Sequence, residues 1–159
     1  MPINLSLRQV SESDFDQLVE LRIAAMRDSL ERLGRFDPAR ARERLRKTFV
    51  PEVTKHILSD SHCAGFYAMR EIDQRFSLDH FYIHPEFQNQ GIGSWALRTV
   101  LKEAETRKMP IVVGALRGSD SNRFYQRHGF KKSSEDEWDI YYLYEVKISE
   151  TSSLSPTYP

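Results

Sequence analysis

One stretch of the chain, residues 76–107, most constrains the fold, because a strand, a glycine-containing loop and a long helix follow one another directly in it. Its first eight residues, FSLDHFYI, are rich in aromatic and β-branched side chains and contain no Gly or Pro, which favours a strand. From Ile92 to Arg107 apolar residues recur at helical spacing, which predicts an amphipathic helix.

Gly91 and Gly93 stand where this helix is expected to begin. The first N–H groups of a helix have no partner within it, and they carry partial positive charge that suits an anion such as a phosphate. A glycine has no Cβ atom to hold that anion away from the backbone. The junction therefore predicts an anion-binding site.

Two known nucleotide-binding motifs also place glycines at the start of a helix. Gly91-x-Gly93-x-x-Ala96 fits the dinucleotide fingerprint of nucleotide-binding oxidoreductases. That fingerprint requires an acidic residue at the end of the next strand, and the corresponding region, residues 112–115, has none. A P-loop is excluded because the Gly-Lys-Ser/Thr sequence is missing.

The spacing of apolar residues and the turn signals along the rest of the chain predict one α/β domain at 1–148, followed by a polar tail at 149–159. We expect strands at 4–10, 54–59, 63–70, 76–83, 111–116, 130–134 and 140–148, and helices at 14–33, 38–49, 92–107 and 121–128. Short turns join the second, third and fourth strands, which predicts an antiparallel meander, and the helix before the fifth predicts a parallel crossover. The expected fold is a mixed, mostly antiparallel sheet of about seven strands flanked by about four helices.

Composition narrows the function classes. The 159 residues carry no formal net charge, so no overall field draws the protein to nucleic acid or to an anionic membrane. We find no stretch as long as a membrane span and no signal peptide, and the single cysteine permits no internal disulfide, so we expect a cytoplasmic protein. The five histidines lack metal-ligand spacing, and we expect no metal.

Two motifs together resemble one family. Gln88-x-x-Gly91-x-Gly93, preceded by YIHPE at 82–86, resembles the acyl-CoA-binding motif of the GNAT N-acetyltransferases. Asn122-x-x-Tyr125-x-x-x-Gly129-Phe130 is similar to a shortened form of a second motif of that family, and the expected order of strands and helices also looks like the family's.

The resemblance implies an enzyme that moves an acetyl group from acetyl-CoA, as co-substrate, to the amine of a small molecule or a protein by direct attack. Backbone groups of Tyr82 and Ile83 would bind the pantetheine arm, and Asn122 would contact the same arm. The Tyr125 hydroxyl would protonate the departing thiolate. The pyrophosphate would lie against the loop formed by Gln88, Asn89, Gln90, Gly91, Ile92, Gly93 and Ser94.

The general base is left open by the sequence. Some family members use a Glu near the start of the central strand, where this chain has Ser77 and Asp79. Strand alternation puts His80 on the opposite face from Asp79. Asp79 or His80 could accept the proton, or no base is needed if the amine arrives neutral. The missing Glu also keeps an alternative open, a catalytically silent CoA-binding module of the same fold.

Acceptor contacts are expected in the segment 26–37, where the family builds its substrate wall: Arg27, Glu31, Arg35 and Phe36. The arginine-rich run at 40–46 is either a solvated helix face or an attractor for an acidic substrate or the cofactor's 3′-phosphate. Tyrosines 141, 142 and 144 would edge the acceptor pocket or form a homodimer interface. Alternation puts Tyr142 and Tyr144 on one strand face and Tyr141 on the other.

Overall fold

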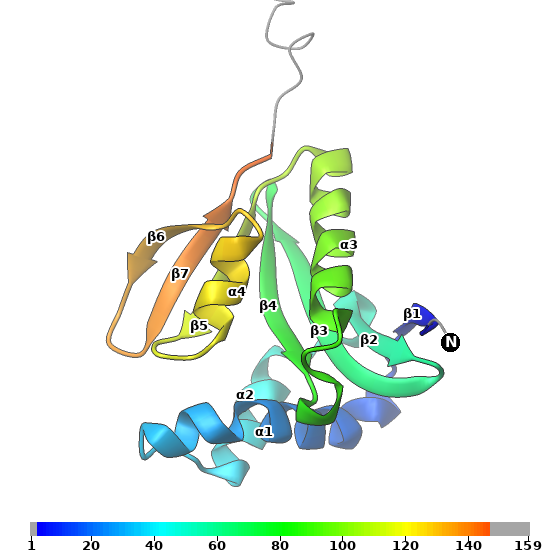
Figure 1. Cartoon of the computed structure of the whole chain (residues 1–159), viewed down its shortest axis with the longest axis vertical. Helices are drawn as coiled ribbons and strands as arrows, with labels where there is room; N and C mark the ends of the chain where they lie inside the picture. Colours follow the sequence, from blue (N-terminus) through cyan, green and yellow to red (C-terminus); the bar gives the residue numbers. More distant parts are fainter. Residues whose placement is uncertain (1–2, 147–159) are drawn as a thin grey trace, which may run out of the picture.

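A seven-stranded sheet in the order β1-β2-β3-β4-β5-β7-β6 runs through the computed structural model, which describes residues 3–146 (Figure 1). Neighbouring strands are antiparallel except β4 and β5, which are parallel, so the predicted meander and crossover are confirmed. The predicted tail at 149–159 and the end of the predicted last strand lie outside the described residues. The strands are β1 (Leu5–Gln9), β2 (Thr54–Ser59), β3 (His62–Ile72), β4 (Arg75–Ile83), β5 (Ile111–Leu116), β6 (Lys131–Glu135) and β7 (Asp139–Tyr144).

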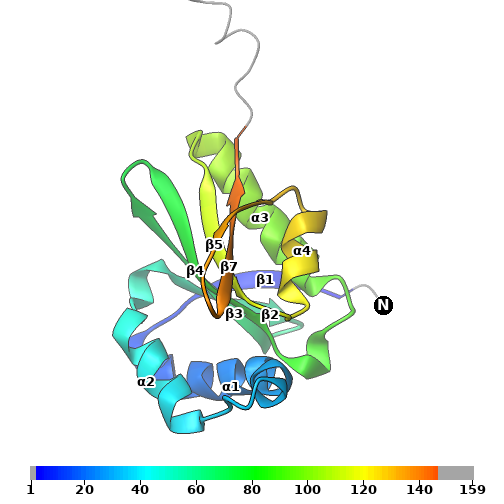
Figure 2. The ribbon, with the colours of Figure 1, turned by 90° about the vertical axis from the view of Figure 1, so that its left-hand side faces the viewer.

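Helices cover both faces of this sheet, as Figures 1 and 2 show from two directions. Helices α1 (Phe15–Arg32) and α2 (Pro38–Thr48) cover one face, and α3 (Ile92–Arg107) and α4 (Ser121–Arg127) cover the other. Single 3₁₀ turns are at Glu12–Asp14, Pro51–Val53 and Pro85–Phe87. The predicted α/β class, a mixed sheet of about seven strands flanked by about four helices, is confirmed.

Local signals explain where the first two helices end and begin. Gly34 follows α1 with φ of +68°, in the left-handed region where a glycine carries no steric penalty. Asp37 caps α2 by accepting a hydrogen bond from the backbone N–H of Arg40 at 3.2 Å, and Pro38 occupies the first helical position. These two features turn the chain so that α1 and α2 lie side by side under the sheet.

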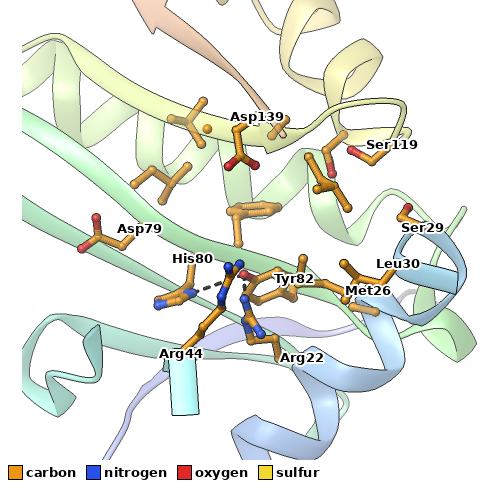
Figure 3. A pocket seen from close by; sticks show the side chains of 18 of the residues that line it. Arg22, Met26, Ser29, Leu30, Arg44, Asp79, His80, Tyr82, Ser119 and Asp139 are labelled. Atoms are coloured by element: carbon orange, nitrogen blue, oxygen red, sulfur yellow. Dashed lines mark hydrogen bonds between the residues drawn. The ribbon is translucent and has the colours of Figure 1, made fainter. Parts of the chain in front are cut away.

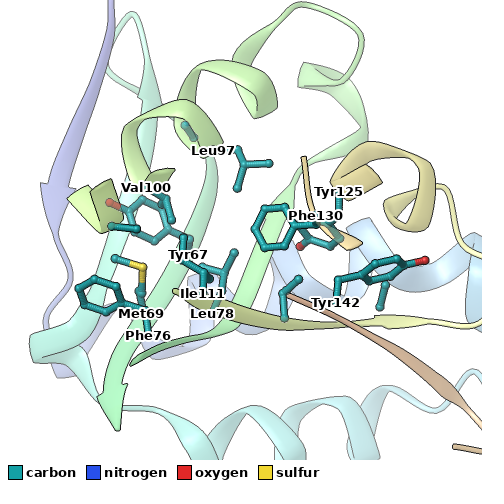
Figure 4. Close-up of a cluster of buried hydrophobic side chains, with 14 of the residues drawn as sticks. Tyr67, Met69, Phe76, Leu78, Leu97, Val100, Ile111, Tyr125, Phe130 and Tyr142 are labelled. Carbon is teal, nitrogen blue, oxygen red and sulfur yellow. The ribbon is translucent and has the colours of Figure 1, made fainter. Parts of the chain in front are cut away.

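Each face of the sheet has its own apolar core. On the α3 and α4 face, Leu97 and Val100 of α3 are fully buried with Ile111 of β5, and Tyr125 and Phe130 extend the same cluster (Figure 4). On the other face, Leu18, Leu45 and Phe66 are buried between α1, α2 and the strands. Burying one such side chain contributes about 1.5–3 kcal/mol, so both helix layers are held to the sheet.

The sheet opens in its middle, between β4 and β5. The two strands pair only where Phe76–Leu78 face Ile111–Val113, and the rest of β4 has no partner on this side although β3 stays paired with it as far as Ile83. Apart from the Ile83 carbonyl, which accepts from the Gln88 side chain, the backbone N–H and C=O groups on this edge of β4 have no strand partner and can bind a ligand. A β-bulge in the β3–β4 register, where Met69 and Ala68 pair with Leu78 and His80, lies at the start of the unpaired part.

Candidate functional site

A cavity of about 600 Å³ lies where β4 and β5 separate. Its floor is formed by both strands, and its walls come from α1, α2, the start of α4 and the turn before β7 (Figure 3). Ile83 and Gln88 line the end nearest α3, and Tyr125 lines the side nearest α4. One cavity thus connects the two regions in which the sequence motifs lie.

The loop before α3 has the geometry of an anion site. Asn89 and Gly91 have φ of +62° and +79°, and the Gln88 side chain donates to the Ile83 carbonyl at 2.9 Å, which ties the loop to the end of β4. The first helical hydrogen bond runs from the Trp95 N–H to the Gly91 carbonyl at 3.0 Å. The N–H groups at 92–94 therefore precede the helical ladder and are available to a ligand, as the sequence predicts for a phosphate.

Gly93 connects this loop to α4. A Cβ atom at this position would lie 3.5 Å from Ile83 and 3.5 Å from Phe124, which is ordinary van der Waals contact. A Cβ at Gly91 would meet nothing within 4 Å. The φ of Gly91 is what favours glycine there, since other residues rarely adopt it.

Tyr125 has a buried ring and a free hydroxyl. The residue is 4% exposed, and its ring packs against Phe81, Phe124, Phe130 and Tyr142 (Figure 4). Tyr125 lines the cavity, and its hydroxyl makes no hydrogen bond to any residue between 3 and 146. Burial raises the pKa of this phenol, so it stays protonated near neutral pH and can donate its proton.

Asn122 has its amide engaged inside the protein. Its nitrogen donates to the Leu116 carbonyl at 3.0 Å and the Ser119 carbonyl at 2.9 Å, and its oxygen accepts from the Tyr142 hydroxyl at 2.8 Å. These bonds fix the start of α4 to the end of β5 and to β7. In this structure Asn122 positions the helix that carries Tyr125, while contact with the CoA arm stays a prediction.

His80 belongs to a buried chain of polar groups. Arg22 donates through Nε to the Tyr82 hydroxyl at 3.2 Å, the hydroxyl lies 3.3 Å from His80 Nδ1, and Nε2 lies 2.7 Å from Thr48 Oγ1. A proton on Nε2 lets every member of the chain donate to the next. Burial, reinforced by the nearby Arg22 charge, lowers the pKa of His80 to about 4, so the ring is neutral and weakly basic at neutral pH.

Asp79 is held by other side chains. Its carboxylate forms an ion pair with Arg70 and accepts from the Ser77 hydroxyl at 2.8 Å. The prediction that Asp79 and His80 lie on opposite strand faces is wrong, because the β-bulge makes Asp79 the extra residue and both residues line the same cavity. In Figure 3 Asp79 lies at the far end of the site from Ser119.

The segment predicted to contact the acceptor does border the cavity, but α1 turns a different set of its side chains toward it. Met26, Ser29 and Leu30 line it. Arg27 and Glu31 form an exposed ion pair at 2.6 Å, and the Arg27 guanidinium lies over the Phe36 ring. Of the four predicted contacts only Arg35 lines the cavity, where it packs against Trp138.

Two charged residues of the cavity, Arg22 and Asp139, belong to no segment that the sequence singled out, while Arg40 and Arg44 come from the arginine-rich run. A signal for Arg22 exists in the sequence, because it stands one helical turn after Leu18 on the otherwise apolar face of α1. Asp139 has a pKa raised by burial and by repulsion from Asp136. A carboxyl group with a raised pKa in a cavity is a candidate for proton transfer.

Metal centres and membrane spans each require a recognisable set of side chains. Among residues 3–146 no group of three or more His, Cys, Asp or Glu side chains could hold a metal ion. Across the same residues, no helix combines the length and the apolar character needed to cross a membrane.

Comparison with known proteins adds independent observations. A family model described as an acetyltransferase (GNAT) domain matches residues 48–132. The PaiA N-acetyltransferase of Thermoplasma acidophilum, solved in complex with coenzyme A, aligns with a TM-score of 0.74 and 18% identity over 89% of this chain and 99% of its own. The ribosomal-protein-S18-alanine N-acetyltransferase of Escherichia coli aligns with a TM-score of 0.71 and 12% identity over 92% of this chain and 96% of its own. At such sequence identities the likeness demonstrates a shared fold alone. A search of the curated proteins found no match to this chain.

Proposed function

This chain belongs to the acetyltransferase (GNAT) family, and from that premise we propose that it transfers an acetyl group from acetyl-CoA to the amine of an acceptor. The single observation that carries the proposal is the cavity at the opening of the sheet. It is lined by the unpaired part of β4 and by Tyr125, whose hydroxyl has no partner among residues 3–146, and at Gln88 it reaches the loop that leads to the free N–H groups at the start of α3.

Each part of acetyl-CoA would lie against one of these features. The loop 88–94 would hold the pyrophosphate on the N–H groups at the start of α3, where the left-handed Asn89 and Gly91 turn the backbone toward the ligand. Near Ile83, whose carbonyl already accepts from Gln88, backbone groups on the unpaired edge of β4 would bind the amides of the pantetheine arm. A thioester placed between the strands would then lie beside Tyr125.

Acetyl transfer needs two proton movements. Attack of the amine nitrogen on the thioester carbonyl forms the C–N bond and breaks the C–S bond, while the nitrogen loses a proton and the thiolate gains one. Tyr125 would give its proton to the sulfur, because its hydroxyl is protonated and unbonded.

For the proton lost by the amine, the contacts favour Asp139 over the two residues predicted from the sequence. Asp79 is held by Arg70 and Ser77, and the two ring nitrogens of His80 lie against Thr48 and Tyr82. The raised pKa of Asp139 makes it the better proton acceptor, and its side chain points into the cavity from the start of β7 (Figure 3).

A titration and a screen test this function. Calorimetry should show acetyl-CoA binding, and a panel of amines monitored by thiol release should contain at least one acceptor. Absence of acetyl-CoA binding at millimolar concentration would disprove the proposal. Binding without turnover on any amine would favour the alternative of a silent CoA-binding module.

A further inference from the structure

The cavity wall formed by α1 and α2 is rich in arginine. Four arginines line the cavity: Arg22, Arg35, Arg40 and Arg44. Three aspartates also line it, but Asp79 is paired with Arg70, and the Asp37 carboxylate caps α2. Asp139 remains as the carboxylate that faces the arginines across the cavity.

The arginines of α2 lie on two sides of the helix, and those on one side only are paired with carboxylates. Arg42 pairs with Asp16 at 2.7 Å and Arg46 pairs with Glu12 at 2.5 Å, on the side of the helix away from the cavity. Arg40 and Arg44 turn toward the cavity, and neither has a carboxylate within ion-pair distance in the part of the chain that the structure describes. The chain therefore supplies counter-charges on one side of α2 and leaves the cavity side without them.

Arg22 is a buried cation that donates its hydrogen bonds to neutral groups. The residue is 8% exposed, Nε donates to the Tyr82 hydroxyl at 3.2 Å and Nη1 donates to the Ala41 carbonyl at 3.2 Å. A guanidinium has five N–H donors, so these two bonds leave donors for a ligand. A buried charge is costly unless an opposite charge is close, which makes an anionic ligand favourable here.

Arg44 reaches the same region from α2. Figure 3 shows its side chain rising beside Arg22 toward Tyr82, with Asp139 extending from the opposite wall. Burial and repulsion from Arg40, Arg35 and Arg22 lower the pKa of Arg44, as expected of like charges gathered around one space. An anion between the guanidinium groups would relieve this repulsion.

We propose that the acceptor is a small amine that carries a carboxylate, as an amino acid does, and that Arg22 and Arg44 bind this carboxylate. The inference rests on the acetyltransferase function proposed above. Asp139 faces the cationic wall and would bind the ammonium group before taking its proton. The contact between Arg35 and Trp138 joins two walls of the cavity, which favours a small acceptor over a folded protein surface.

Paired acceptors test the proposal. The thiol-release assay would compare each amino acid with its own amide, which keeps the amine and the side chain and removes the carboxylate charge. The best acids should exceed their amides in kcat/KM by about tenfold or more, as expected for charge-assisted hydrogen bonds. Amides that react as well as the acids would overturn the inference and leave the acetyltransferase function intact.

Two variants on one helix localise the effect. Arg44→Gln should reduce the advantage of acids over amides about tenfold, mainly through KM, with a smaller effect on the amides. Arg42→Gln removes an arginine of the same helix that is paired with Asp16 outside the cavity, and it should leave the advantage unchanged. Equal effects of the two variants would overturn the proposal, since any loss would then follow total charge.

A binding measurement separates this proposal from the function on which it rests. N-acetyl amino acids should stabilise the wild-type protein against thermal unfolding more than their amides do, whether or not acetyl-CoA binds. Loss of this difference in Arg44→Gln supports the anion site, and its absence in the wild type overturns it. If Arg44→Gln instead abolishes a preference for CoA over dephospho-CoA, Arg44 serves the 3′-phosphate and the proposal is wrong.

Discussion

The guanidinium carbon of Arg35 lies 3.8 Å from the centroid of the Trp138 ring. Arg35 comes from the loop between α1 and α2, and Trp138 comes from the turn between β6 and β7, so the contact joins opposite walls of the cavity. Such a contact at a partly exposed site is worth about 0.5–1 kcal/mol, enough to order two loops without locking them.

Trp138→Ala should therefore weaken acceptor binding more than folding. We expect KM for the acceptor to rise about fivefold, because about 1 kcal/mol of loop ordering is lost, with acetyl-CoA affinity unchanged. Steady-state kinetics with each substrate varied would measure both values. Trp138→Phe keeps an aromatic face for Arg35 and should retain most of the affinity. An unchanged acceptor KM in Trp138→Ala would contradict this role.

Tyr125→Phe removes only the hydroxyl that faces the cavity. Turnover should fall about 10²-fold or more, as for loss of a general acid, with little change in CoA affinity by calorimetry. Tyr67→Phe is a matched control, since Tyr67 is also a buried tyrosine of the same apolar cluster and does not line the cavity. If the two variants have equal turnover, Tyr125 contributes packing alone.

Gly91 can be tested with two substitutions that share one backbone strain. Both Gly91→Ala and Gly91→Glu place a Cβ on a residue with φ of +79°, but only Glu adds bulk and negative charge beside the free N–H groups. Gly91→Ala should bind CoA with modest loss, and Gly91→Glu should not bind it measurably. Circular dichroism would verify folding, and normal CoA binding by a folded Gly91→Glu variant would mean that the phosphate lies elsewhere.

His80 makes stability depend on pH. Its folded pKa of about 4 lies below the unfolded value near 6.5, so the unfolded chain takes up the proton first as the pH falls. The contribution of His80 to the free energy of unfolding is therefore fully present above pH 6.5 and is lost progressively toward pH 4. The loss between pH 7 and pH 5 is about 2 kcal/mol. Urea unfolding at both pH values should show that His80→Gln lacks this contribution. An identical pH dependence in wild type and variant would exclude His80 as its source.

Gly65 permits close approach of β3 and β4. A Cβ atom there would lie 2.2 Å from the Tyr82 carbonyl oxygen, on a strand that cannot move without disturbing the cavity. Gly65→Ala should destabilise the protein by about 3 kcal/mol in urea unfolding, as overpacking does. Gly93→Ala, whose Cβ would meet atoms at 3.5 Å, should cost much less. Similar stability of the two variants would argue against the clash with Tyr82 as the cause.

The strand order and the glycine loop could be predicted because their signals are local. The 76–107 stretch carries its period, its turn glycines and its helix start within a few residues. The arginine-rich wall of the cavity could not be predicted from local sequence in this way. Arg22 and Asp139 are far apart in the sequence, and only the packing of α1 and β7 brings both to one cavity. The bulge at Asp79 depends on the register of β3, which no local pattern reveals.

The rotation of α1 about its own axis explains why most of the predicted acceptor contacts do not line the cavity. A helix turns by about 100° per residue, so knowing that segment 26–37 forms a wall does not say which of its side chains face the cavity. The choice depends on how α1 packs on Phe66, which is fully buried in the middle of β3. Met26 rather than Arg27 consequently faces the cavity.

The opening between β4 and β5 leaves an unsatisfied strand edge in the interior of the sheet rather than at its border. Edges of this kind attract other strands, and the protein can complete this one only with something that resembles a peptide in its spacing of donors and acceptors. A ligand lying there would act as a missing length of strand. The ligand should then stabilise the two halves of the sheet against each other, by an amount that rises with the logarithm of its free concentration.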